Sequence, residues 1–315
     1  MKSKVGSLNA APFTVTATGD WLVGPARYPG NNSQHEAGTI HDDATARTLG
    51  FRSGTVAGSI HMEQFVPLCE HVFGREWSES GAGSLSLYFL NPSIDQEPVY
   101  AMVAQHEIFD GVCRRRQVTM KTAAGVTVLE GTASIGEFDQ ASAVRLRLQS
   151  QLSRAWPPVA PRILAQVSIG FSATHLPTRI LQADIDARLE IITEKCTEFS
   201  VPGMDGHTVA PLSAAVHAMR VFEDKLAIGE QEFVGMFGAI DWQYLRGPVW
   251  ADYPYEVSGQ VLAITDSPKT EILWYECILH DPATSQDVAR MLMMSRLLKS
   301  TSSLWKQQSL IEPGS

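Results

Sequence analysis

The stretch HEAGTIHDDATARTLGFRSGTVAGSIH covers residues 35–61 and joins groups capable of acid–base chemistry to the start of an apolar helix. Glu36 and His41 stand five positions apart, just ahead of a glycine-containing loop. Gly58 stands where a helix over residues 59–72 should begin, and backbone N–H groups at such a position have no partner within the helix. They can polarise a carbonyl oxygen, while a carboxylate and an imidazole can share one water.

Around this stretch, the first half carries strand-like segments separated by turn residues. These segments are 12–18, 84–90, 99–108, 113–121 and 126–135. A short helix over 44–49, capped by Asp42 and Asp43, and the longer apolar helix lie between the first and second strands. One long helix followed by a four-stranded meander predicts an α+β unit, in which a curved antiparallel sheet wraps the helix.

The second half repeats this order of elements. A strand at 166–173 and a helix at 210–226 precede strands at 233–242, 255–264, 271–280 and 288–298, although the last also fits helical spacing. We therefore expect a first repeat at 1–140, a proline-containing linker at 141–165 and a second repeat at 166–315. Two such units can pack as a homodimer would, with a cleft at the joint.

The composition and charge of the chain argue against several classes of function. The chain has 315 residues, of which 44% are hydrophobic and 19% charged, as in a globular protein. The net charge of −9 argues against nucleic acid as a partner. Four widely separated cysteines indicate a reducing, cytoplasmic location, and the apolar segments are too short to span a membrane. Since the chain carries no phosphate-binding glycine loop, nucleophile elbow or metal-ligand motif, we expect neither a cofactor nor a metal.

The stretch resembles the MaoC-like (R)-specific enoyl-CoA hydratase and dehydratase family, which has a hot-dog fold. The residues that match the family pattern in order are Glu36, His41, Asp43, Ala46, Phe51 and Gly58. The whole chain resembles the double hot-dog form of that family. Glu36 stands where the family usually has aspartate, and Ala57 replaces the histidine before the helix glycine. Only the first repeat carries the motif.

The resemblance implies a hydro-lyase that adds water to, or removes it from, an unsaturated or 3-hydroxy acyl thioester. Glu36 and His41 would act as the acid/base pair on a shared water, and the Gly58 N–H would polarise the thioester carbonyl. Substrate contacts would come from Asp43, Phe51 and Ser59. The second repeat would shape the substrate site without catalysing, any coenzyme A would enter as part of the small-molecule substrate, and the protein would be a monomer or a homodimer.

Other residues leave alternatives open. Arg114 and Arg116 share one face of a predicted strand and could meet a coenzyme A phosphate, or could keep an exposed strand edge charged. Glu63 lies where hot-dog thioesterases place a catalytic carboxylate, which would make the chain an acyl-thioester hydrolase. His207 and Asp241 could line the opposite wall of the cleft. A non-catalytic acyl-binding protein is the third alternative.

Overall fold

The computed structural model describes residues 12–31, 33, 36–79, 81–153, 160–203, 206–228 and 233–306. The strands of the first half are β1 (Thr16–Thr18), β2 (Trp21–Val23), β3 (Gly83–Phe89), β4 (Val99–Ala104), β5 (Ile108–Phe109), β6 (Cys113–Thr122) and β7 (Thr127–Gly136). Those of the second half are β8 (Ser172–Arg179), β9 (Gly235–Tyr244), β10 (Pro254–Asp266), β11 (Thr270–Asp281) and β12 (Gln286–Leu298).

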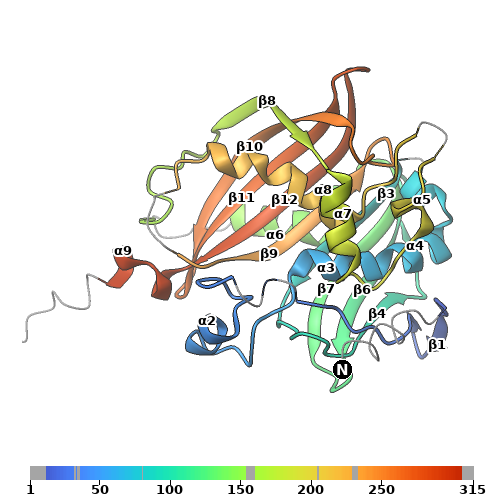
Figure 1. Cartoon of the computed structure of the whole chain (residues 1–315), viewed down its shortest axis with the longest axis horizontal. Helices are drawn as coiled ribbons and strands as arrows, with labels where there is room; N and C mark the ends of the chain where they lie inside the picture. Colours follow the sequence, from blue (N-terminus) through green and yellow to red (C-terminus); the bar gives the residue numbers. More distant parts are fainter. Residues whose placement is uncertain are drawn as a thin grey trace, which may run out of the picture.

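All of these strands join one 12-stranded sheet in the order β1-β2-β4-β6-β7-β3-β9-β12-β11-β10-β8, with β5 added beside β6 (Figure 1). The two halves meet where β3 pairs antiparallel with β9, for example Ser86 with Asp241 and Leu87 with Ile240. Outward from this joint, β7, β6, β4 and β2 follow on one side, and β12, β11, β10 and β8 follow on the other. The duplicated order expected from the sequence is therefore present.

The helical segments of the first half are α2 (Asp43–Thr48), α3 (Gly58–Met62), the 3-10 turn η1 (Glu63–Phe65), α4 (Val66–Phe73) and α5 (Glu76–Glu79). Those that follow are α6 (Ala143–Leu152), α7 (Gln182–Leu189), η2 (Thr197–Phe199), α8 (Leu212–Met219), η3 (Arg220–Lys225), η4 (Lys299–Thr301) and α9 (Ser303–Lys306). The helix predicted over 59–72 is thus divided. Pro67 stands in the first turn of α4, where its missing N–H costs nothing.

The two central helices, α3 and α8, contact each other on one face of the sheet (Figure 1). Ile60, Phe65 and Leu68 of the first half are buried in the same apolar cluster as Val216 and Phe222 of the second half. This main core spans both repeats, so the burial of apolar surface holds the two halves together as well as folding each one. No helix in the described part of the chain is long and apolar enough to cross a membrane.

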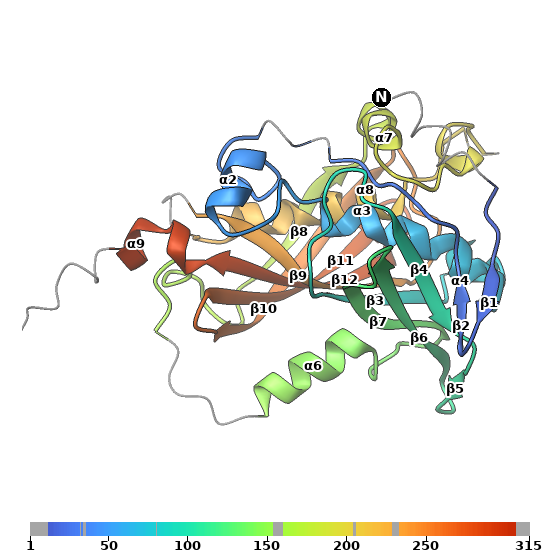
Figure 2. The same ribbon diagram turned by 90° about the horizontal axis from the view of Figure 1, so that it is seen from below.

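The predicted linker at 141–165 contains a helix that the sequence reading missed. Helix α6 packs on the face of the sheet opposite to α3 and α8, across the joint of β3 and β9 (Figure 2). Val144 and Leu148 form a second, smaller core with Trp274. The Ser142 hydroxyl donates a hydrogen bond to the Asp241 carboxylate beneath the helix, and burial raises the pKa of Asp241. Pro157 and Pro158 lie outside the described residues.

Three predicted elements need correction. The first strand is shorter than predicted, β1 being preceded by irregular chain, and the first strand of the second half is β8 rather than 166–173. The helical alternative for 288–298 is wrong, since β12 pairs with both β9 and β11. The buried residues of β12 are apolar on both faces of the sheet, because the main core covers one face and α6 covers part of the other. A strand buried on two faces loses the alternation that distinguishes it from a helix.

Candidate functional site

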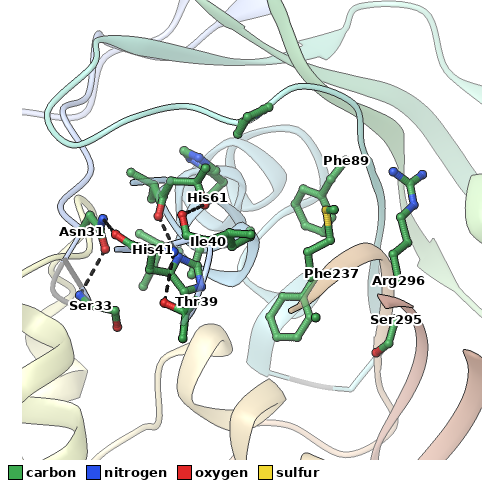
Figure 3. Close-up of a pocket in the computed structure, with 18 of the residues that line it drawn as sticks. Asn31, Ser33, Thr39, Ile40, His41, His61, Phe89, Phe237, Ser295 and Arg296 are labelled. Carbon is green, nitrogen blue, oxygen red and sulfur yellow. Dashed lines mark hydrogen bonds between the residues drawn. The ribbon is translucent and has the colours of Figure 1, made fainter. Parts of the chain in front are cut away.

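A cavity of about 790 Å³ lies between the two halves, and residues from both line it. The first half contributes its motif stretch and the end of β3, while the second contributes α7, α8 and the strands β9 and β12. Figure 3 shows His41 and Thr39 on one side, and Phe89, Phe237 and Arg296 on the other. A cavity of this size at the joint of two units is suited to a small-molecule ligand.

The imidazole of His41 is held by the loop that follows it. Its Nδ1 lies 2.7 Å from the Thr55 carbonyl oxygen, and the Asn31 side-chain amide donates to the His41 carbonyl at 2.8 Å. A ring nitrogen facing a carbonyl carries the proton, so the neutral tautomer has its Nε2 lone pair free. The sequence reading identified His41 but not the Thr55 contact that orients it.

Glu36 lines the same cavity from its exposed edge. Its carbonyl accepts hydrogen bonds from the Thr39 backbone N–H at 3.2 Å and from the Thr39 hydroxyl at 2.8 Å, which forms a tight turn between Glu36 and His41. Within the described part of the chain, no hydrogen bond or ion pair joins the two side chains. The structure thus brings both predicted catalytic residues to one cavity, and their sharing of a water stays a prediction.

Asp42 and Asp43 have structural roles. Asp42 caps α2 by accepting from the Thr45 N–H at 2.7 Å, as predicted. Asp43 accepts from the Ser53 hydroxyl at 2.6 Å and from the Gly54 N–H at 2.8 Å, and it does not line the cavity. The predicted substrate contact of Asp43 is therefore not supported, because this carboxylate instead ties down the loop that carries Thr55.

Gly58 begins α3 at the cavity wall, as predicted. A Cβ at this position would stand 2.8 Å from two ring carbons of Phe89, so only glycine allows the ring to lie against the first turn of the helix. The predicted substrate-binding residue Phe51 also lines the cavity. The structure therefore places the helix start and two aromatic rings around one space.

A histidine of the second half lies at this site, which the sequence reading missed. His217 of α8 lines the cavity, and its Nε2 lies 3.2 Å from the Ser59 hydroxyl. Burial, together with the charges of Arg188 and Arg220, lowers the pKa of His217 to about 3. The ring is therefore neutral near pH 7. Ser59 is fully buried and does not itself line the cavity, so it bonds to a wall residue rather than to the predicted substrate.

His61 forms a further polar part of the wall. Its Nε2 lies 2.7 Å from the Ser93 hydroxyl, and burial lowers its pKa to about 4. Its buried Nδ1 has no hydrogen-bond partner among the described residues. His61 lies on α3 three positions after Gly58, within the motif stretch. Spacing along the sequence gave no signal for His217, because α8 of the second half brings it to the cavity.

The remaining predicted site residues lie elsewhere. Arg114 and Arg116 share one face of β6, as predicted, but they pair with Glu107 and do not line the cavity. The strand-edge alternative is not supported, because at Arg114 β6 pairs with β5 on one side and with β7 on the other. His207 lines a separate hollow of about 400 Å³, and Asp241 lies under α6, so neither forms the opposite wall.

Glu63 also lies away from the cavity lining. It is 1% exposed and accepts the Ser213 N–H at 2.6 Å, so it caps the start of α8. Its pKa is raised by burial, an effect that the amides of the α8 first turn partly offset. The side chain is packed between the two helices, where a substrate thioester has no access to it.

Comparison with known proteins gives no match to a protein-family model and none to a curated protein. Solved structures do match. A candidate MaoC domain protein dehydratase from Chloroflexus aurantiacus is 10% identical, with a TM-score of 0.53 over 91% of this chain and 94% of that one. A conserved hypothetical protein from Mycobacterium tuberculosis, described as having a double hotdog fold, is 11% identical, with a TM-score of 0.53 over 91% and 96%.

This chain has a double hot-dog fold. The sequence-based expectation of the fold is therefore confirmed, and the resemblance to MaoC-like dehydratases is supported as a likeness of architecture. Because one fold serves many activities, the chemistry has to be argued from the cavity itself.

Proposed function

We propose that this double hot-dog protein hydrates an α,β-unsaturated acyl thioester, or dehydrates the corresponding 3-hydroxy acyl thioester, without a cofactor. The observation that carries the proposal is the orientation of His41. The Thr55 carbonyl fixes its Nδ1–H, so its Nε2 is a proton acceptor at a cavity that Glu36 and Gly58 also line. Neutral imidazole held in this way is a suitable general base.

In the proposed reaction, one of the two side chains removes a proton from water as the water oxygen bonds to the β-carbon. The electron pair of the double bond moves onto the α-carbon and the thioester oxygen, and the other side chain donates a proton to the α-carbon. One water is added in total, and dehydration is the reverse. The Gly58 N–H, at the start of α3, would stabilise the charge on the oxygen.

The position of Glu63 disfavours the thioesterase alternative. A carboxylate that activates water for hydrolysis has to reach the thioester carbon. Glu63 is buried between α3 and α8, accepts a backbone N–H, and lies outside the cavity lining.

The proposal is tested with a panel of 2-enoyl-CoA thioesters of increasing chain length. The product mass reports the addition of water, and a thiol reagent reports hydrolysis. Glu36→Gln and His41→Asn should each lower kcat by roughly 10²–10⁴-fold while leaving the melting temperature unchanged. Glu137→Gln and His106→Asn are matched controls, because both residues are exposed and outside the cavity lining. Wild-type turnover by either site variant would refute the assignment, and thiol release without hydration would favour a hydrolase.

A further inference from the structure

Arg188 of α7 is a cation without a partner in the cavity wall. Its guanidinium forms no hydrogen bond or ion pair with the described residues, and its Nε is a buried donor without an acceptor among them. An arginine side chain keeps its charge under all ordinary conditions. Withdrawing such a charge from water is costly unless an anion or a set of acceptors replaces the water. The residues that the structure describes supply neither.

The other charged groups of the cavity are satisfied or exposed. Arg220 is paired with Glu223 at 2.6 Å, and Arg296 donates to the Tyr88 hydroxyl. Glu36 stands at the exposed edge. With Arg220 and Glu223 paired, the other charged residues of the cavity wall are Arg188, Arg296 and Glu36. Of these two arginines, Arg188 is the one whose side chain has no hydrogen-bond acceptor among the described residues.

Arg188 lines the cavity from α7, where its side chain is partly buried. Helix α7 contacts α8, and the charge of Arg188 acts on His217, which lines the same cavity. The carboxylates of Glu63 and Asp184 also act on Arg188, but neither is close enough for an ion pair. Because Arg188 lines the cavity, an anion bound there can reach its guanidinium.

We propose that Arg188 binds a carboxylate carried by the acyl group, so that the preferred substrates are thioesters of dicarboxylic acids. This inference rests on the proposed function and names its substrate class. A planar guanidinium matches the two oxygens of a carboxylate, and the resulting hydrogen bonds are charge-assisted. The anionic groups of coenzyme A are the other possible source of negative charge. We favour the acyl carboxylate because Arg188 is partly buried and lines the same cavity as His41 and Gly58, where the acyl group would lie.

Binding of saturated thioesters tests the inference without requiring turnover. Isothermal titration compares glutaryl-CoA with butyryl-CoA, which differ only in the terminal carboxylate. The wild type should bind glutaryl-CoA at least about tenfold more tightly, and Arg188→Met should abolish that preference while binding butyryl-CoA as before. Arg188→Lys should restore part of it. Arg147→Met, on α6 at the opposite face, is the matched control. Equal melting temperatures establish that the variants are folded.

Each outcome decides a separate question. A wild-type protein without preference, or an Arg188→Met variant that keeps the preference, would overturn the inference. Equal loss of both ligands in Arg188→Met would assign the arginine to the coenzyme A moiety instead, which also overturns it. If glutaryl-CoA is preferred but no enoyl thioester is hydrated, including the unsaturated counterpart glutaconyl-CoA, the recognition of the carboxylate stands and the proposed reaction fails.

Discussion

Replacing His217 with glutamine should weaken the dependence of stability on pH between pH 7 and pH 5. In the folded protein, burial and two nearby arginines lower the pKa of this ring from 6.5 to about 3. Over this range the unfolded chain takes up a proton at position 217 and the folded chain does not. The free energy of unfolding therefore falls as the pH falls, and the contribution of the neutral ring is fully present only above about pH 6.5.

The size of the effect follows from the two pKa values. One pH unit corresponds to about 1.36 kcal/mol for one proton. Between pH 6.5 and pH 5 this gives about 2 kcal/mol, because the folded ring stays neutral throughout. His217→Gln removes the titrating group and keeps a side chain that can hydrogen-bond to Ser59. The wild type should therefore lose about 2 kcal/mol more than the variant between pH 7 and pH 5.

Urea unfolding followed by tryptophan fluorescence at pH 7, 6 and 5 measures the difference, provided that the m-values agree. His61→Gln should reduce the slope by a similar amount, since burial lowers the pKa of His61 to about 4, and the two effects should add in the double variant. His106→Gln, at an exposed position, is the control. A difference between wild type and His217→Gln that is the same at pH 7 and pH 5 would refute the reasoning.

Three further variants test the construction of the site. Gly58→Ala should lower kcat/KM and the melting temperature, because the new methyl group would stand 2.8 Å from the Phe89 ring, and Phe89→Leu in the same chain should recover part of both; no recovery would mean that this contact is not the cause. Glu63→Ala should cost about 1–2 kcal/mol in urea unfolding through loss of the α8 cap, with kcat retained, and an abolished kcat would instead favour the hydrolase. Asp43→Ala should cost about 1 kcal/mol and raise the rate of proteolysis in the loop after α2, whereas unchanged proteolysis would mean that other contacts hold this loop.

The sequence predicted the elements whose signals are local. The strand-like composition of β3, β4, β6 and β7, bounded by turn residues, placed these strands within a few residues, and the aspartates before α2 placed the start of that helix. Helix α6 was missed because its apolar residues are not gathered on one face: Val144 and Leu148 are buried, whereas Leu146 and Leu152 are exposed. Its place on the sheet depends on partners such as Trp274 from the other half, which the order of residues does not reveal.

The same distinction applies to the site. Glu36, His41 and Gly58 lie on one short stretch, so their spacing was enough to bring them together in the prediction. Arg188 and His217 reach the cavity from helices of the other half, and the depth of their burial is decided by tertiary packing. The pairing of β3 with β9 sets this arrangement, and a pattern with a period of two residues cannot specify which strand pairs across the joint.

The two central helices make the same kind of contact twice, with different residues. Ser59 and Ser213 are each the second residue of their helix, and Glu63 and His217 each stand four positions later. On one side of the joint, neutral His217 meets the Ser59 side chain and leaves the first turn of α3 beside the cavity. On the other, the carboxylate of Glu63 accepts the Ser213 backbone N–H, and neither residue lines the cavity. A carboxylate fills the acceptor position at a helix start, whereas an imidazole bonded to a side chain leaves the backbone amides available to a ligand. The restriction of the candidate site to one side of a duplicated fold therefore follows from which of these two residues stands at the equivalent position.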